Sequence, residues 1–422
     1  MARARARSGA GKSIFDPVHG PISLPPAAVA LLGTPEFQRL WGIRQTGFAH
    51  LVFPGANHTR LEHSLGTYWV AGQMAERLGL PDATRRQVEA AALLHDLGHP
   101  PFSHTLDGPL HEVLGIDHEQ LSRARIEGRE PTGAPATGAV AEALRAHGLA
   151  PPAVADLIDP GPGRRVPPLP GEILHGAIDA DRIDYMQRDA HYTGVAHGAV
   201  DAVRLLDTLR ARGEHLAFAE KGRGAVEGFL VGRALMYSTV YYHKTVRAAE
   251  SMAQAAVERL PGYPGDAGRL FALTDGELLV RLRDAGGISA ELADGLLARR
   301  LYKRVFGWRS IPPAARGGWR RLLHRPTERR ALEDELAARL RAPPGSVLLD
   351  LGGLEPRGRP AEDWRKIGLV VDDVVTRPFR REGPWRLLAV RPPAEWAVSV
   401  YAAPNLRRAA EALRPRLARW AP

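Results

Sequence analysis

The sequence contains no cysteine among its 422 residues. This absence excludes disulfide bonds, thiolate zinc sites and cysteine nucleophiles together, so any metal has to be bound by His, Asp and Glu side chains. Apolar runs approaching the roughly 18 residues that span a bilayer are also missing, and the basic N-terminus lacks the apolar stretch of a secretory signal. We therefore expect a cytoplasmic protein that makes no membrane contact.

Lysine is scarce as well, because only five of the 57 basic residues are lysine and the rest are arginine. A codon bias toward G and C is one interpretation of this preference, since Ala, Gly and Pro are also abundant. The formal net charge of +10 still creates a positive field. Such a field attracts polyanions, which include phosphate-rich small molecules and nucleic acids, the latter expected to bind weakly.

Helical periodicity dominates most of the sequence, whereas short runs of branched apolar residues dominate its last part. Apolar residues recur at helical spacing in these segments: 27–45, 62–78, 84–95, 173–189, 203–255 and parts of 266–342. The predicted strands come later, before a final helix at 406–419, and they are 347–352, 368–375, 385–390 and 396–401. The pattern predicts a mainly α fold with a helical body and a small α+β C-terminal module.

The predicted organisation has three parts. Residues 1–13 are expected to form a disordered basic tail, residues 14–342 a helical catalytic domain, and residues 343–422 the small C-terminal module. Within the helical domain, residues 128–171 are rich in Pro and Gly and contain one predicted helix near 140–147. Such a segment is typical of a mobile insertion or lid over an active site.

His95 and Asp96 end a predicted apolar helix that starts with a capping box at Thr84. Adjacent side chains on a helix point about 100° apart, so both can reach one ion near the helix end. A buried aspartate without a partner would be costly there, and a bound metal removes that cost. With His63 upstream and Asp181 downstream, two imidazoles and two carboxylates are available. This set suits one divalent ion, with Mn²⁺, Fe²⁺, Mg²⁺, Ni²⁺ and Zn²⁺ not distinguished.

Longer strings around these residues carry a family resemblance: IFDPVHGPI, FPGANHTRLEHSLG, HDLGHPPFSHTLD, DHEQ, DADRIDYMQRDAHYTG and YYHK. Over residues 14–250 the sequence resembles the HD-domain deoxynucleoside triphosphate triphosphohydrolases, which include bacterial relatives of the human SAM-and-HD-domain enzyme. The resemblance implies an HD-domain helical core, a homo-oligomer (tetramer or hexamer) and deoxynucleoside triphosphates (dNTPs) as substrates. It implies metal binding by His63, His95, Asp96 and Asp181, and it allows a second Mg²⁺ that accompanies the triphosphate.

The resemblance also assigns a catalytic cluster, which consists of His99, His104, Asp107, His118 and Glu119. Cleavage between the deoxyribose 5′-oxygen and the α-phosphate needs a proton for the leaving alkoxide, which a histidine with a carboxylate partner can deliver. His118 with Glu119, or His104, is the expected general acid. The residues expected to bind the substrate are Gln45, Thr46, Arg60, Arg182, Tyr185, Asp189, Arg233, Tyr241 and Lys244, with arginine suited to bidentate contacts with phosphate.

Two departures from the family pattern stand out. Thr46 occupies a position next to the expected sugar contact where the family usually has leucine. Gly33 and Trp41 stand where nucleotide-regulated members have an acid and an arginine that bind an activating guanine, which argues against activation of that kind.

Two alternatives to dNTP hydrolysis remain open from the sequence. One is a different HD phosphohydrolase, acting on nucleoside monophosphates or on an alarmone. The other is a nucleic-acid-binding protein in which the HD site is vestigial and the basic surface carries the function.

Overall fold

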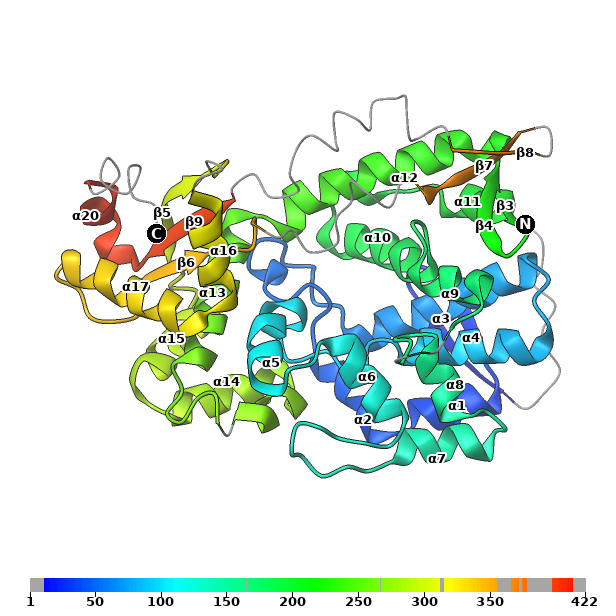
Figure 1. The fold of residues 1–422 in the computed structure, drawn as a ribbon, viewed down its shortest axis with the longest axis horizontal. Helices are drawn as coiled ribbons and strands as arrows, with labels where there is room; N and C mark the ends of the chain where they lie inside the picture. The colour runs from blue at the N-terminus through cyan, green and yellow to red at the C-terminus, as the bar shows by residue number, and fades with distance from the viewer. Residues whose placement is uncertain are drawn as a thin grey trace.

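The computed structural model describes residues 11–161, 163, 165–265, 267–311, 315–354, 366–371, 374–377 and 397–412. Helices dominate this part of the chain, and its strands form three small sheets, so the predicted mainly α fold is confirmed. Figure 1 shows the elements from β5 onward gathered at one end of the molecule, except β7 and β8, which lie beside β3 and β4 at the other. None of the described helices is both long and apolar enough to cross a bilayer.

The described elements have the following bounds. The α-helices are α1 (Pro26–Leu32), α2 (Pro35–Gln38), α3 (Arg60–Arg77), α4 (Asp82–Leu94), α5 (Asp107–Leu114), α6 (His118–Ile126), α7 (Ala139–Ala146), α8 (Pro151–Asp156), α9 (Pro168–His175), α10 (Ala180–Thr193), α11 (Ala202–Thr208), α12 (Arg223–Met236), α13 (Lys244–Glu258), α14 (Asp275–Asp284), α15 (Gly287–Leu297), α16 (Arg316–His324), α17 (Pro326–Arg339) and α20 (Arg407–Ala412). Shorter helical turns are η1 (Arg39–Gly42), η2 (Ala49–Leu51), η3 (Ser103–Leu106), η4 (Ala196–Gly198), η5 (Glu220–Gly222), η6 (Tyr237–Tyr241), η7 (Ala267–Ala272) and η11 (Pro404–Leu406). The strands are β1 (Lys12–Asp16), β2 (Gly20–Leu24), β3 (Leu209–Arg212), β4 (His215–Ala219), β5 (Lys303–Trp308), β6 (Val347–Asp350), β7 (Gly368–Val371), β8 (Val374–Thr376) and β9 (Val398–Ala402).

An antiparallel hairpin of β1 and β2 opens the described chain, with Ile14 opposite Ile22. The boundary predicted at residue 13 therefore falls inside a strand, and residues 1–10 lie outside the described part. The helical pattern predicted over 27–45 corresponds to three short helices, α1, α2 and η1. Thr34 is extended, as the following Pro35 requires, and this breaks the helical path.

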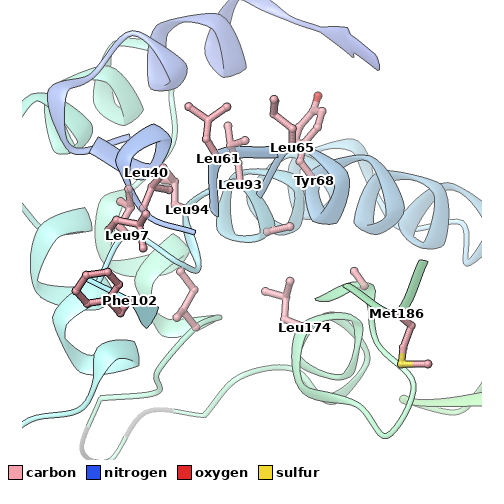
Figure 2. Close-up of a cluster of buried hydrophobic side chains, with 14 of the residues drawn as sticks. Leu40, Leu61, Leu65, Tyr68, Leu93, Leu94, Leu97, Phe102, Leu174 and Met186 are labelled. Carbon is pink, nitrogen blue, oxygen red and sulfur yellow. The ribbon is translucent and has the colours of Figure 1, made fainter. Parts of the chain in front are cut away.

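Helices α3 and α4 pack closely on each other. Thr59 and Glu62 cap α3 reciprocally, whereas α4 begins after Pro81 rather than at Thr84, so the predicted cap of α4 is wrong. Figure 2 shows the apolar side chains between them, and they include Leu61, Leu65, Leu93 and Leu94. Full burial of one such side chain contributes about 2 kcal/mol, so this contact fixes the end of α4 firmly against α3.

The described part of residues 128–171 contains α7 at the predicted place, the unpredicted helix α8 and the first turn of α9. α8 contacts α4 and α6, and its Val154 and Ala155 are buried. This part of the predicted lid is thus packed on the helical core. The helix predicted over 173–189 is two helices, α9 and α10, separated at Gly176.

The helical pattern predicted over 203–255 is interrupted by strands. A β-hairpin of β3 and β4 separates α11 from α12, and the turn η6 separates α12 from α13. β4 pairs in parallel with β7, with Phe218 opposite Leu369, so a strand from the C-terminal part completes this sheet. The predicted strand over 368–375 is therefore a second hairpin, of β7 and β8.

The C-terminal module begins earlier than the predicted residue 343. β5 lies within the segment predicted to be helical, yet it pairs with β9, which also pairs with β6. A second hydrophobic core around Val305, Trp319, Leu336 and Val400 joins these strands to α16 and α17. The predicted strand over 385–390 lies outside the described residues, and so does the end of the predicted final helix beyond α20.

Candidate active site

The end of α4 places His95 and Asp96 at the wall of a cavity. The His95 ring donates from Nδ1 to the carbonyl oxygen of Ala92, 2.8 Å away. Its Nε2 atom is buried and makes no hydrogen bond within the described part of the chain. Asp96 Oδ2 accepts from Arg60 Nη1 at 2.7 Å, and Asp96 Oδ1 lies 3.2 Å from His95 Nε2. An imidazole with a fixed tautomer beside an oriented carboxylate is the usual form of a metal ligand pair.

His63 from α3 and Asp181 from α10 approach the same point. His63 Nε2 lies 2.9 Å from Asp181 Oδ1 and 3.7 Å from Asp96 Oδ2, and His95 Nε2 lies 3.9 Å from Asp181 Oδ1. Burial lowers the pKa of His63, but hydrogen bonds with Asp181 and Asp184 and the charge of Asp96 outweigh burial and raise it to about 10. The cluster therefore attracts cations strongly. Its His and Asp composition fits a divalent metal ion.

Asp184 supports His63 from behind. Its Oδ2 accepts from His63 Nδ1 at 2.7 Å, and its Oδ1 accepts from His19 Nε2 at 2.6 Å. Arg188 donates to both oxygens of Asp184, at 2.9 and 3.0 Å, and to Asp16 at 2.8 Å. Because Nδ1 of His63 is engaged in this way, its Nε2 is the atom presented to a metal.

Gly66 leaves the space that Asp184 occupies. A Cβ atom at this position would lie 1.8 Å from Asp184 Oδ1 and 2.4 Å from Arg188 Nη2, both far inside contact distance. The glycine of the HSLG string is thus required by a close approach between α3 and α10.

We expect Asp184→Asn to weaken binding of Mn²⁺ by about 10- to 100-fold, the usual effect of changing a group that orients a metal ligand. Gly66→Ala should do the same, because its Cβ displaces Asp184. Isothermal titration with Mn²⁺, together with thermal melting to detect unfolding, measures both variants. Gly72→Ala on the same helix is the control, since its Cβ would come no closer than 3.1 Å to Glu89. Unchanged Mn²⁺ affinity in a folded Asp184→Asn protein would contradict this role.

A second cluster adjoins the first. His99, His104, Asp107 and His118 offer ligand-type atoms within 4.8 Å of one another. His104 Nδ1 lies 2.9 Å and His118 Nδ1 lies 3.5 Å from the Asp107 carboxylate, while the rings of His99 and His118 stack at 4.1 Å. The sequence paired His118 with Glu119, but the carboxylate beside its ring is that of Asp107.

Contact between the two clusters runs through Asp96 and His99, whose Oδ1 and Nε2 atoms are 3.2 Å apart. Burial, followed by the charges of Arg60 and His118, holds the pKa of His99 well below its usual range, so this ring is neutral. Its Nδ1 is buried without a hydrogen-bond partner among the described residues. His99 therefore lies between His118 and the cluster of His63, His95 and Asp96.

The loop that carries His99 and His104 is strained. Phe102 and Ser103 have φ values of 60° and 54°, the left-handed region that non-glycine residues rarely occupy. Asp275 accepts the Phe102 N–H at 2.6 Å, and Ser103 Oγ accepts from Arg60 Nε at 2.8 Å. These contacts hold the loop in a conformation that directs both histidine rings toward the cavity.

Gly98 brings α6 next to this loop. A Cβ atom on Gly98 would lie 2.1 Å from the carbonyl oxygen of His118. The Gly98 N–H donates to Ser122 Oγ, which itself donates to the carbonyl oxygen of His95. The first turn of α6, with His118, is therefore tied directly to the end of α4.

Both clusters face one cavity that is open to solvent. The lining residues are Gln45, Arg60, Thr67, His95, Asp96, His99, His104, His118, Glu119, Ile158, Leu174, His175, Asp181 and Tyr185.

Two families match the chain. Residues 60–189 match the HD domain, and residues 200–413 match the family described as the HD associated region. The second match alone spans half of the chain. The chain belongs to the HD-domain proteins that carry an HD-associated region. The HD domain contains all four residues predicted to bind the metal, with His95-Asp96 as its central pair.

The chain is also similar to several known proteins. The chain is 38% identical over 250 residues to the uncharacterized protein MJ1154 of Methanocaldococcus jannaschii. This match covers 58% of this chain and 49% of that protein. It is 32% identical over 315 residues to the deoxynucleoside triphosphate triphosphohydrolase SAMHD1 of Gallus gallus. This match covers 65% of this chain and 50% of that protein. The chain thus spans about half the length of the curated relatives it matches. A solved phosphohydrolase (BT4208) of Bacteroides thetaiotaomicron shares the fold, with a TM-score of 0.68 at 24% identity over 93% of this chain and 99% of that chain.

Only part of the predicted substrate set lines the HD-domain cavity. Gln45, Arg60 and Tyr185 lie on its wall, and the Gln45 Oε1 atom is buried without a hydrogen bond in the described chain. Thr46 is not among the lining residues, although its hydroxyl is buried and makes no hydrogen bond there either. Gln45 therefore presents an unused hydrogen-bond acceptor at the cavity wall.

The other predicted contacts lie away from the cavity wall. Arg182 is bonded to Asp179, and Asp189 accepts from His58 and Tyr241. The guanidinium of Arg233 lies 5.6 Å from the Tyr237 ring, and Lys244 is exposed at the start of α13. In this conformation they do not contact the cavity.

The sequence missed several groups of the site. Thr67, Ile158, Leu174 and His175 line the cavity, and the last three come from the end of α8 and from α9. Leucine and isoleucine in a helical sequence give no signal that separates a cavity wall from a core. His19 and Asp184 lay within the quoted family strings, but nothing in those strings separated them from the neighbouring polar residues.

Proposed function

We propose that this HD-domain protein is a metal-dependent phosphohydrolase that converts a dNTP and water into a deoxynucleoside and inorganic triphosphate. The observation that supports this most strongly is the contact between Asp96 and His99, which joins a metal-type cluster to a proton-transfer cluster in one cavity. The similarity to a deoxynucleoside triphosphate triphosphohydrolase over 65% of the chain supports the substrate class.

The reaction breaks the bond between the deoxyribose 5′-oxygen and the α-phosphorus and adds the oxygen of water to that phosphorus. His63, His95, Asp96 and Asp181 would hold a divalent ion, which would supply Lewis acidity for activation of water, and a second Mg²⁺ would accompany the triphosphate. His118, charged beside Asp107, donates the proton that the leaving 5′-oxygen requires. Arg60 supplies a fixed positive charge on the cavity wall for the phosphate oxygens.

The decisive experiment is identification of the phosphate product. Metal-loaded protein is incubated with each of the four dNTPs, and the released phosphate species are separated by ion-exchange chromatography. Tripolyphosphate with free deoxynucleoside is the expected result. Pyrophosphate or orthophosphate would overturn the proposal and favour another HD phosphohydrolase, for which nucleoside monophosphates and an alarmone are the next substrates to test.

Discrimination between dNTPs and NTPs depends on the residues near the sugar. Gln45 is placed to hydrogen-bond the 3′-hydroxyl, and Thr46 is smaller than the leucine usual in the family. A missing methyl group changes discrimination by about 1–3 kcal/mol, or about 10- to 200-fold, so we expect a loose preference for dNTPs. Thr46→Leu should sharpen this preference. The ratio of kcat/KM values for matched dNTP and NTP pairs measures it, and an unchanged ratio would assign the exclusion to Tyr185 instead.

A further inference from the structure

The HD-associated region reaches the candidate active site where η7 leads into α14. This junction contacts the loop from His99 to His104, which we call the histidine loop. At the start of the loop, Arg39 donates through Nη1 to the carbonyl oxygen of His99 at 3.0 Å and through Nε to the last carbonyl oxygen of η7 at 2.7 Å. Further along, Asp275 Oδ1 accepts the N–H of Phe102 at 2.6 Å. The junction is therefore linked to the histidine loop at two points.

Asp275 also binds a second part of the cavity wall. Its Oδ2 accepts the N–H of Arg44 at 3.1 Å, and the next residue, Gln45, lines the cavity. The Nη1 atom of Arg44 lies 3.8 Å from the same carboxylate oxygen. One carboxylate from the HD-associated region thus joins the histidine loop to the segment that presents Gln45.

The same two parts of the wall are joined to each other and to Arg60. Ser103 Oγ donates to the carbonyl oxygen of Arg44 at 2.7 Å and accepts from Arg60 Nε at 2.8 Å. The backbone of Arg44 is therefore held by Ser103 on one side and by Asp275 on the other. A shift of Arg44 would also move the hydroxyl that orients Arg60, the cation proposed to contact phosphate oxygens.

A carboxylate at the position of Asp275 is costly, because the residue is only 3% exposed and a buried charge needs hydrogen-bond partners. Capping of α14 does not account for it, since Thr274 and Glu277 already form a reciprocal capping box at that helix end. Both oxygens of Asp275 instead accept backbone N–H groups of other segments. One of these segments contains Phe102 and Ser103, whose left-handed backbone persists only where the surroundings fix it. The buried charge thus serves the cavity wall.

We propose that Asp275 is a positioning residue, which holds the histidine loop and the Gln45 segment in the arrangement that hydrolysis requires. Its effect on catalysis rests on the proposed function, whereas its effect on the loop does not. Asp275 is not among the residues that line the cavity, so it acts through the backbone of Phe102 and Arg44. Such placement matters because a displacement of a reacting group by about 1 Å can lower the rate by about 100-fold.

The test compares Asp275→Ala and Asp275→Asn with the control Glu277→Ala. Asp275→Ala removes both acceptors and should lower kcat for dNTP hydrolysis by about 10- to 100-fold. Asp275→Asn should lose less, because the amide oxygen still accepts one of the two N–H groups. Glu277→Ala removes a cap of the same helix, through Thr274, without changing the cavity lining, so its kcat should stay close to that of the unaltered protein.

Hydrogen–deuterium exchange provides a second measurement that does not depend on hydrolysis. Peptides that contain Phe102 or Arg44 should exchange faster in Asp275→Ala, because their N–H groups lose an acceptor, and at least one should do so in Asp275→Asn. Neither should change in Glu277→Ala. Metal content should stay the same in all three variants, since the hydrogen bonds of Asp275 go to the two backbone N–H groups and not to the proposed metal ligands.

Three results would overturn the positioning role of Asp275. These are unchanged exchange of both peptides in folded Asp275→Ala protein, an unchanged kcat in that variant, and equal losses of kcat in Asp275→Ala and Glu277→Ala. If Asp275→Ala does not fold, the same comparisons with Asp275→Asn decide. If even the unaltered protein does not hydrolyse dNTPs, but the peptides exchange faster only in the Asp275 variants, the proposed function is wrong and the role of Asp275 in holding the loop stands.

Discussion

The double variant His95→Ala/Asp96→Ala is expected to lose its metal ion and its hydrolytic activity together. His95 Nε2 is buried without a hydrogen bond in the described chain, and Asp96 lies between His63, His95 and His99, so both groups are placed to hold an ion. Loss of direct ligands should exceed the roughly 10- to 100-fold effect of outer groups such as Asp184. We expect hydrolysis to fall to the background rate.

Elemental analysis of the purified variant, combined with the phosphate-product assay, measures both losses. His111→Ala is the matched control, because His111 is an exposed histidine on α5 outside both clusters. Metal content equal to that of the unaltered protein would refute the assignment of His95 and Asp96 as ligands. Loss of metal with retained hydrolysis would instead refute the requirement for the ion.

The variant His118→Ala is expected to keep its metal and bind dNTP but to lose about 10²- to 10⁴-fold in kcat, the usual contribution of a general acid. His118 contributes no atom to the cluster of His63, His95 and Asp96, so metal content should not change. Single-turnover kinetics with a saturating dNTP separates the chemical step from binding. A near-normal kcat would make His104, the second histidine beside Asp107, the better candidate.

The pH profile distinguishes the carboxylate that acts on His118. Burial lowers the pKa of His118, but the charge of nearby Asp107, and to a lesser degree of Glu119, outweighs burial and raises it. A general acid loses its proton as the pH rises through its pKa, so kcat should fall only above about pH 6.5, the ordinary histidine value. Asp107→Asn should move this fall to lower pH, whereas Glu119→Gln should move it less. Equal shifts in the two variants would contradict the assignment to Asp107.

Local sequence patterns predicted the elements that are decided locally. The apolar spacing of 62–78 gave α3, the short pattern near 140–147 gave α7, and the branched apolar run at 347–352 gave β6. Hydrophobic periodicity within one segment is enough to specify such elements. It fails where a strand depends on pairing with a distant segment. This is the case for β3 and β4, whose sheet is completed by β7 from the other end of the chain.

In the candidate site, too, some features depend on local sequence and others on contacts between distant segments. The four proposed metal ligands could be identified from their residue types and their family strings, because a metal restricts the choice of side chain. The pairing of His118 with Asp107 instead of Glu119 could not be identified from the sequence, because it depends on how α5 and α6 are placed relative to each other. The cavity contacts of Ile158 and Leu174 depend likewise on packing of α8 and α9 against the core.

The hairpin at the start of the chain has a consequence for how the protein is made. His19 and Asp184 are 165 positions apart, and Arg188 reaches back 172 positions to Asp16, yet these contacts set the orientation of His63. Contacts between such distant positions close a long loop, and closing that loop costs conformational entropy. During synthesis, α10 leaves the ribosome after α3 and α4 because it follows them in the sequence. The support of His63 by Asp184 therefore cannot form until about half of the chain has been made.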